Sequence, residues 1–259
     1  MTVLDDLQAE LTAATNRMLA TAATLSDADV TAPSLLAGWT RGHVLTHVAR
    51  NADSHINLVT WAKTGVYTPQ YPTPGAREAE IAEGAGRPIA EQHADLADSA
   101  ARLGAAFATM PPQAWAAAVR GMRPPDHPAW YLLARRIREV EIHHVDLGAG
   151  YTWADWPEEF VLRELHDAMA GWPYAESTVS AVHAGDRSWT GLGEGPVVEG
   201  PPPAVLAWLT GRLPDGGTGE AGGGTGPGLR LAEKPPAAPP WLTMPAPPGL
   251  PATPPEEYP

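Results

Sequence analysis

Residues 138–147 read Arg-Glu-Val-Glu-Ile-His-His-Val-Asp-Leu, a pattern that places polar groups on one side of a helix. Glu139 and His143 are four residues apart and project from the same side, and Asp146 follows three residues later. Burying a carboxylate and an imidazole is costly unless they pair or bind a metal. The spacing therefore predicts a divalent metal site built on this helix. His144 is turned about 100° further round and does not share that side.

A second polar helix face appears in residues 38–55, which read GWTRGHVLTHVARNADSH. His43 and His47 are four apart, and Asn51 and His55 continue nearby faces. A histidine pair at this spacing also occurs on solvated helices, so the pair is informative only together with the first stretch. Helical bundles build metal sites from facing helices. A donor set of two nitrogens and one oxygen suits catalytic zinc, with nickel, cobalt, manganese and iron left open.

The first half of the chain favours helices, as the spacing of its apolar residues and its proline and glycine breaks indicate. Helices are expected over residues 4–18, 40–63, 89–110 and 127–147. Thr40 stands at the expected N-cap of the second of these helices, and Gly65 follows its end. We expect these four helices to form an antiparallel bundle in a domain spanning residues 1–150.

The second half changes character after Gly150. Residues 158–170 keep a helical period, residues 177–184, 187–193 and 196–200 favour short strands, and residues 203–213 favour a helix. Residues 214–228 are glycine-rich and predict a flexible loop. The expected organisation is α+β: the four-helix bundle, a small α/β domain over residues 151–234, and a proline-rich tail over residues 235–259 that is extended or disordered.

The composition argues against nucleic-acid and membrane partners and against a thiol carried by the protein itself. The chain has 259 residues and a formal net charge of −13, which argues against a nucleic-acid partner. It contains no 18-residue uncharged apolar run and no basic-then-apolar leader, so we expect a cytoplasmic protein without a membrane partner. Cysteine is absent. Any thiol chemistry must therefore use a small-molecule thiol taken from solution.

The two histidine-bearing stretches resemble a known family. Residues 38–53 resemble the second helix of mycothiol-dependent maleylpyruvate isomerases, which belong to the DinB-like superfamily of metal-binding four-helix bundles. Residues 138–147 look like that family's fourth-helix signature, and residues 200–212, GPPPAVLAWLTGR, resemble the core of its C-terminal domain. The similarity covers most of residues 1–242.

The resemblance implies specific roles for individual residues. It selects His47, not His43, and His143, not His144, so the implied metal ligands are His47, Glu139 and His143. The side chain of His43 is then either a surface group or a hydrogen-bonding neighbour of the site. The implied cofactors are a divalent metal, most simply zinc, and mycothiol as thiol co-substrate. Arg77 and Arg212 are candidates for binding substrate carboxylates; the alternative for each is an ordinary surface arginine. Asn51, His55 and Asp146 are candidates for contacts around the cofactors.

Three functions remain open at this point. The resemblance implies an isomerase in which thiolate adds to the cis double bond of a maleylpyruvate-like diacid and is eliminated after rotation. The second possibility is a mycothiol S-transferase that releases a thiol adduct of an electrophile. The third is a non-catalytic, metal-stabilised binding module. In each case the partners are small molecules, and we expect a monomer.

Overall fold

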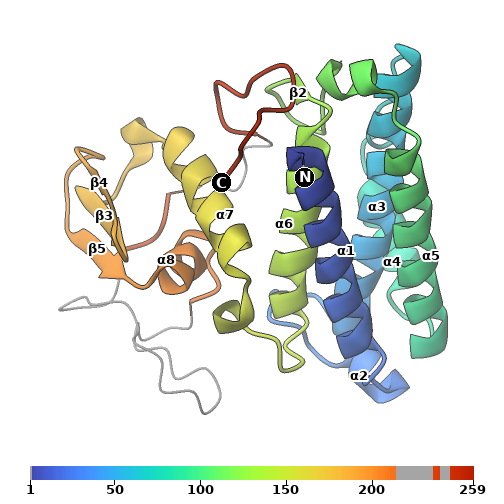
Figure 1. Ribbon diagram of the computed structural model, residues 1–259. Coiled ribbons are helices and arrows are strands. Elements are labelled where there is room, and N and C mark those ends of the chain that lie inside the picture. Colours follow the sequence, from blue (N-terminus) through green and yellow to red (C-terminus); the bar gives the residue numbers. More distant parts are fainter. Residues whose placement is uncertain (1, 214–235, 240–245) are drawn as a thin grey trace. The chain divides into compact units, whose positions relative to one another are not determined.

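The chain forms two compact units in the computed structural model, which describes residues 2–213, 236–239 and 246–259. One unit comprises Met1–Tyr151 and Gly249–Tyr258, and the other lies within Thr152–Pro248 (Figure 1). Within the described residues, no helix has both the length and the apolar character needed to cross a membrane. The predicted glycine-rich loop over residues 214–228 lies outside the described residues.

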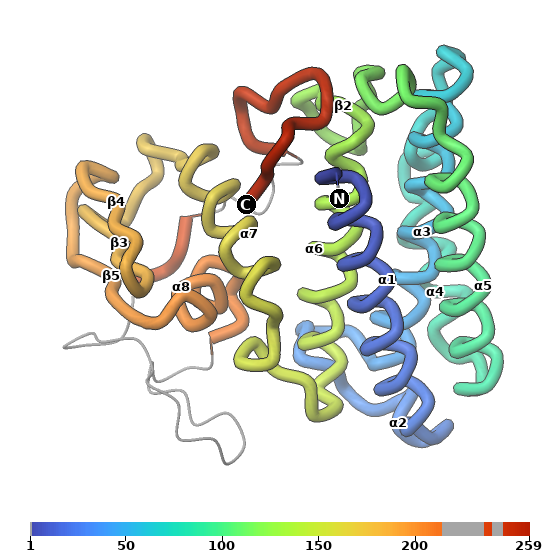
Figure 2. The backbone as a smooth tube through the Cα atoms, viewed as in Figure 1, coloured from blue at the N-terminus to red at the C-terminus, as the bar shows by residue number. Residues whose placement is uncertain are grey.

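Four long helices make up the first unit. They are α1 (Val3–Ala22), α3 (Arg41–Thr64), α5 (Ile89–Ala108) and α6 (Tyr131–Asp146). Helix α3 packs against α5 and α6, and α1 packs against the same two helices (Figure 2). Each helix buries one apolar stripe; in α1 this stripe runs from Val3 through Leu11 to Met18. The four-helix core expected from the apolar spacing is therefore present.

Helix α3 begins and ends where its sequence predicts. Thr40 is the N-cap: its side chain accepts a hydrogen bond from the backbone N–H of His43, whose own side chain contacts the Thr40 backbone N–H. Gly65 ends the helix in the left-handed conformation with φ of 71°, which glycine adopts without steric cost. These two local signals set the length of the helix that carries His47.

The cap at Thr40 has a measurable consequence for stability. Replacing Thr40 by Ala leaves the first backbone donors of α3 without a side-chain acceptor, so we expect the free energy of unfolding to fall by about 1 kcal/mol. Urea denaturation followed by circular dichroism measures this change. Thr60→Ala is the matched control, because Thr60 is exposed on the same helix. Equal unfolding free energies for the two variants would contradict the role of the cap.

Two short helices were not predicted from the sequence. Helix α2 (Asp27–Thr31) starts at the N-cap Ser26, and α4 (Ala76–Gly84) starts after Gly75, whose φ is 83°. Helix α4 packs against α3. Because these helices have few apolar positions, the sequence shows little helical periodicity there. Helix α4 nevertheless carries Arg77, which contacts His47.

Helix α6 begins four residues later than predicted. The two-residue strand β2 (His127–Pro128) pairs antiparallel with β1 (Ala118–Val119), and this pairing takes up the residues assigned to the helix start. Proline has a fixed φ and no backbone N–H, so Pro128 is equally compatible with an extended segment. The pairing partner lies outside the helix and does not appear in its apolar pattern.

The second unit is an α+β arrangement around a three-stranded sheet. The strand order is β4 (Arg187–Thr190), β3 (Ala181–Ala184) and β5 (Val197–Gly200); β3 is antiparallel to β4 and parallel to β5. Helix α8 (Pro202–Leu209) packs against α7 (Glu158–Ala170), β3 and β5. These elements agree with the predicted helices and strands, except that α8 is shorter than expected.

The described part of the proline-rich tail, residues 246–259, consists of turns and irregular backbone. Gly249–Tyr258 group with the first unit. The indole Nε1 of Trp130 donates to the carbonyl oxygen of Pro251 at 2.9 Å, and the ring of Tyr258 lies 5.1 Å from that of Trp130, centroid to centroid. Trp130 is completely buried and needs a hydrogen-bond acceptor for its N–H. The returning segment supplies that acceptor.

Candidate metal centre

The polar residues of α3 and α6 meet inside the helical bundle. His47 of α3 is 3% exposed, and its Nε2 lies 3.1 Å from both Oε2 of Glu139 and Nε2 of His143, which belong to α6. The Nε2 of His143 lies 3.5 Å from the same carboxylate oxygen. Among the described residues, these three form a group whose ligand atoms all lie within 4.8 Å of one another.

The spacing of these three atoms fits a tetrahedral metal site. Zinc bonds of 2.0–2.1 Å at tetrahedral angles separate two ligand atoms by about 3.3 Å. The three measured separations, 3.1, 3.1 and 3.5 Å, bracket this value. Glu139 remains 30% exposed, so one side of the group is open to solvent. Three ligands with one open side are typical of catalytic rather than structural zinc sites.

Asp146 contacts His143 through the ring nitrogen that does not face the other two ligand residues. One of its carboxylate oxygens lies 2.8 Å from Nδ1 of His143, and the residue is only 1% exposed. A carboxylate in this position accepts a hydrogen bond from Nδ1–H, which would leave Nε2 of His143 to bind a metal at the point where the three ligand atoms converge. A role of Asp146 at the cofactors stays a prediction.

The charges of the three residues are strongly coupled. Burial, and then the neighbouring His143, lower the pKa of His47 to about 4, so its imidazole is neutral at pH 7. Burial alone would raise the pKa of Glu139, but hydrogen bonds from His143 and His47 hold it well below its usual value. Burial opposes the charged form of His143, yet hydrogen bonds to Asp146 and Glu139 outweigh it and raise its pKa. A neutral imidazole and an ionised carboxylate are the forms that bind metals.

Helix α4 brings Arg77 to the same place. Its Nη2 lies 3.3 Å from Nδ1 of His47, and its guanidinium lies 5.8 Å from the centre of the Trp39 ring. The Trp39 ring in turn lies 5.6 Å from that of His47. Arg77 therefore stands at the edge of the ligand group, although it is distant in sequence from both ligand helices.

Two further residues, Trp39 and Tyr71, interact with groups of this site and were not proposed from the sequence. Trp39 precedes the N-cap of α3, and its position eight residues before His47 was the available signal. Tyr71 lies in the loop before α4, and burial raises the pKa of its hydroxyl, with a hydrogen bond to Ser54 opposing that shift. The charges of Glu139 and Arg77 also act on this hydroxyl. A lone tyrosine in a proline-rich loop carries no pattern that points to a site.

Asn51 and His55 lie further along α3 and are buried. The side-chain oxygen of Asn51 accepts from Nη1 of Arg136 at 2.7 Å, and its backbone oxygen lies 2.9 Å from Nδ1 of His55. The structure thus shows both residues in contacts within the bundle core. Their expected contacts with a thiol cofactor stay predictions.

The two neighbouring histidines have other partners. Nδ1 of His43 lies 2.8 Å from Oγ1 of Thr40, within the cap of α3. Nε2 of His144 lies 2.7 Å from Oγ1 of Thr21, and its ring stacks on that of Tyr151 at 3.7 Å. Neither belongs to the group of three ligand atoms.

Arg212 belongs to the second unit, just after α8. Its backbone N–H donates to the carbonyl oxygen of Ala207 at 2.7 Å, and its Nη1 donates to that of Thr210. These contacts lie within the second unit. A role of Arg212 in binding substrate stays a prediction.

Comparisons with known proteins identify the family of this chain. Residues 11–148 match the family described as mycothiol maleylpyruvate isomerase N-terminal domain. A crystal structure of a mycothiol-dependent maleylpyruvate isomerase is similar at 30% sequence identity and a TM-score of 0.79, covering 91% of this chain and 96% of that one. The structure of a histidine-to-alanine mutant of such an isomerase is similar at 29% identity and a TM-score of 0.78, with the same coverage. The search of curated proteins gave no match. This chain belongs to the mycothiol-dependent maleylpyruvate isomerase family and is an enzyme.

Proposed function

We propose that this chain is a metal- and mycothiol-dependent cis–trans isomerase of a maleylpyruvate-like diacid. The observation that carries the proposal is the convergence of His47, Glu139 and His143 on one point inside the bundle, in a chain of this family. The absence of cysteine agrees with it, because the nucleophilic sulfur then has to come from a separate thiol.

His47, Glu139 and His143 would hold the metal, and zinc fits the donor set and the separations. A divalent ion bound there lowers the pKa of a thiol that coordinates it, which makes the thiolate available at neutral pH. The single carboxylate among three ligands leaves the loaded site with a net positive charge. Such a site favours an anionic sulfur and an anionic substrate.

The thiol supplies the nucleophile: its sulfur bonds to one carbon of the cis double bond, the remaining carbon–carbon single bond rotates, and elimination of the sulfur leaves the trans diacid. Two groups of the protein would assist the reaction. Arg77, at the edge of the ligand group, would bind a substrate carboxylate in a bidentate pair. The hydroxyl of Tyr71, whose pKa burial raises, would donate a hydrogen bond to the enolate oxygen formed on addition.

The position of the proton on the His47 ring affects whether Arg77 can bind a substrate carboxylate. When Nε2 of an imidazole binds a metal, Nδ1 carries the hydrogen and becomes a donor. Nδ1 of His47 can then no longer accept from Arg77, which lies 3.3 Å away. With His47 in that tautomer, the guanidinium of Arg77 would be available to pair with a substrate carboxylate.

Thiol-dependent turnover is the direct test. Purified metal-loaded protein is incubated with maleylpyruvate and mycothiol, and the loss of the cis compound is followed. We expect turnover that requires both the metal and mycothiol, with no net consumption of thiol. Stable thiol adducts without isomerisation would instead establish an S-transferase. Full metal occupancy with neither activity would establish a binding module.

Replacement of Arg77 tests the substrate contact. Arg77→Met removes the guanidinium, so we expect the KM for the diacid to rise about tenfold or more, with the KM for mycothiol unchanged. Steady-state kinetics with each substrate varied in turn measure both constants. Arg102→Met is the control, since Arg102 pairs with Asp53 on an exposed face. A diacid KM that matches the control would remove Arg77 from the proposed site.

A further inference from the structure

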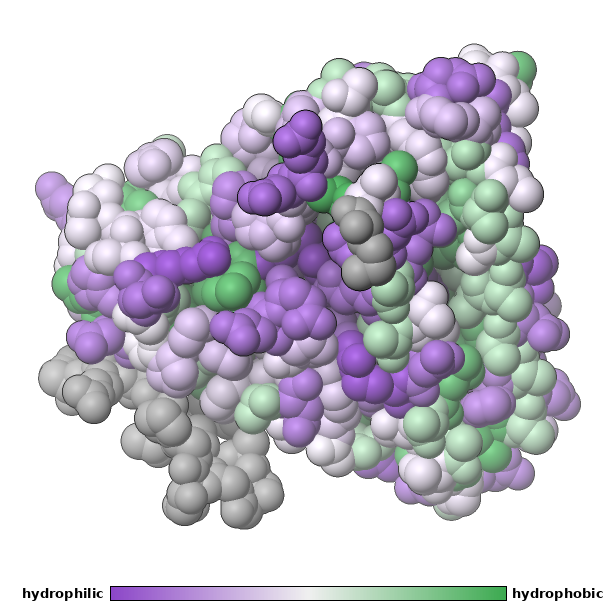
Figure 3. All heavy atoms as spheres, viewed as in Figure 1, coloured by the Kyte–Doolittle hydropathy of each residue, from purple (hydrophilic) through white to green (hydrophobic). Residues whose placement is uncertain are grey.

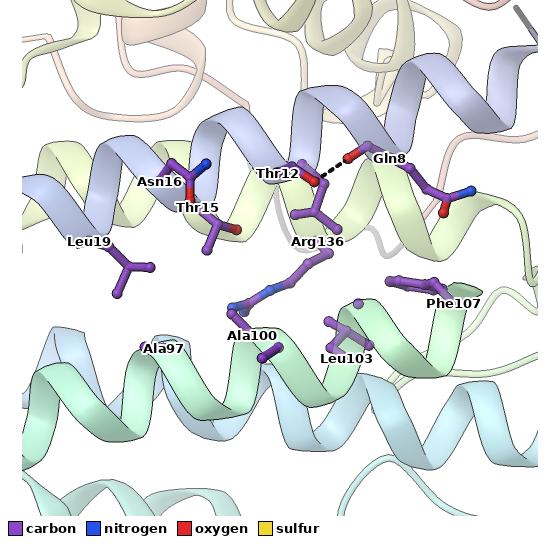
Figure 4. A pocket seen from close by; sticks show the side chains of 13 residues that line it. Gln8, Thr12, Thr15, Asn16, Leu19, Ala97, Ala100, Leu103, Phe107 and Arg136 are labelled. Atoms are coloured by element: carbon purple, nitrogen blue, oxygen red, sulfur yellow. Dashed lines mark hydrogen bonds between the residues drawn. The ribbon is translucent and has the colours of Figure 1, made fainter. Parts of the chain in front are cut away.

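Helix α6 carries two adjacent arginines whose surroundings differ. The surface of α5 is mildly hydrophobic (Figure 3), and Arg136 lies between α1 and α5 (Figure 4), where it is only 1% exposed. Its Nη1 donates to the backbone oxygen of Val48 and to Oδ1 of Asn51, so it joins α6 to α3. Adjacent residues of a helix project about 100° apart, so Arg135 points to a different side of α6.

Arg135 lies on the side of α6 that carries the metal ligands. It precedes Glu139 by four residues, so the two side chains start on the same side of the helix, about 6 Å apart along its axis. A Cβ added at Gly121 would lie 2.8 Å from both Nη2 of Arg135 and Oε1 of Gln70, so the guanidinium lies next to the residue that precedes Tyr71. Tyr71 interacts electrostatically with both Arg135 and Glu139. Arg135 and the ligand group therefore lie in one region of the first unit.

The guanidinium of Arg135 has no counter-ion among the residues that the structure describes. Its hydrogen bond there joins Nη1 to Nε2 of His127 at 2.7 Å, and it takes part in no ion pair with them. Burial, and then the charge of Arg135, lower the pKa of His127 to about 3, so this imidazole is neutral at pH 7. The guanidinium stays protonated in proteins. Arg135 is only half-buried and its Nη2 is not completely enclosed, so this nitrogen can donate to a ligand.

A partly desolvated cation without a counter-ion is costly, and a carboxylate bound beside it would remove that cost. Arg77, beside His47, would bind the carboxylate next to the reacting double bond. We propose that Arg135 binds the other carboxylate of the diacid, at the pyruvyl end away from the cis double bond. This assignment rests on the proposed function. It makes Arg135 the residue that selects a diacid over a monoacid of the same length.

Substrate preference tests the assignment. Maleylacetone has a methyl group in place of the pyruvyl carboxylate, so we expect metal-loaded, full-length protein to show at least about tenfold higher kcat/KM for maleylpyruvate. Arg135→Met should lower kcat/KM for maleylpyruvate by at least about tenfold and leave that for maleylacetone unchanged. Arg120→Met is the matched control, because Arg120 pairs with Asp126 on an exposed surface. An equal loss for both compounds in Arg135→Met would show a purely structural role and would overturn the assignment.

Binding of acids that do not react tests the same contact without turnover. Adipate carries two carboxylates, whereas hexanoate, of equal length, carries one. We expect calorimetric titration of the metal-loaded protein to show adipate binding about tenfold tighter than hexanoate, and Arg135→Met to bind the two equally. Equal affinities in the unmodified protein, or a preference for adipate that survives Arg135→Met, would refute the proposal. Because neither acid is isomerised, this result is independent of whether the chain turns over maleylpyruvate, so a failure of the proposed function is distinguished from a failure of this assignment.

Discussion

His47→Ala and His143→Ala are each expected to release most of the bound metal and to abolish thiol-dependent turnover. Each substitution removes one of only three protein ligands, and a site left with two does not retain a divalent ion against dialysis. The loss in turnover should be on the order of 10³-fold or more, since the thiolate no longer forms readily at neutral pH. Elemental analysis after dialysis and the turnover assay measure the two effects.

The neighbouring histidines provide the controls for this prediction. His43→Ala and His144→Ala remove imidazoles that contact Thr40 and Thr21 instead of the ligand group. We expect both variants to keep the metal, although each loses some stability because a cap or a buried stacking contact is lost. Metal loss in His43→Ala with full retention in His47→Ala would reverse the ligand assignment.

Asp146→Asn is expected to weaken metal affinity by about 10- to 100-fold without removing any ligand. The carboxylate of Asp146 fixes the proton on Nδ1 of His143 at 2.8 Å and makes its Nε2 a better donor. Asparagine has nearly the same shape but no charge, so the change isolates the electrostatic contribution. Competition with a fluorescent chelator measures the affinity.

Asp53→Asn is the matched control, because Asp53 pairs with Arg50 and Arg102 on the other side of α3. The metal affinity of the Asp53→Asn variant should equal that of the unmodified protein. If Asp146→Asn behaves like Asp53→Asn, the Asp146 carboxylate serves packing alone and does not tune the site.

Local sequence signals predicted much of the fold. Thr40 and Gly65 set the ends of α3 through contacts within a few residues, and the 3–4 spacing of apolar residues showed the four long helices. The same local rule placed Glu139 and His143 on one side of α6, since residues four apart lie one turn apart in any helix. These features depend on neighbours in the chain, which the sequence displays directly.

Features that depend on the docking of distant segments were not predictable in this way. His43 and His47 share a helix side, and their spacing alone does not distinguish them; the packing of α3 against α6 brings His47 next to Glu139. Arg77 sits on an unpredicted helix, and residues 249–258 return to Trp130 across more than a hundred residues. No local pattern shows such contacts, because they reflect the summed packing of whole helices.

Residues 138–147 illustrate both the local signals and the effects of packing. The spacing of Glu139, His143 and Asp146 places them on one side of a helix, because residues three or four apart lie about one turn apart. That His47 and Arg77 lie at this side of α6 follows from the packing of α3 and α4. The physical reason is that the direction a helix face points is set by the burial of apolar surface against its neighbours, which is a property of the whole bundle.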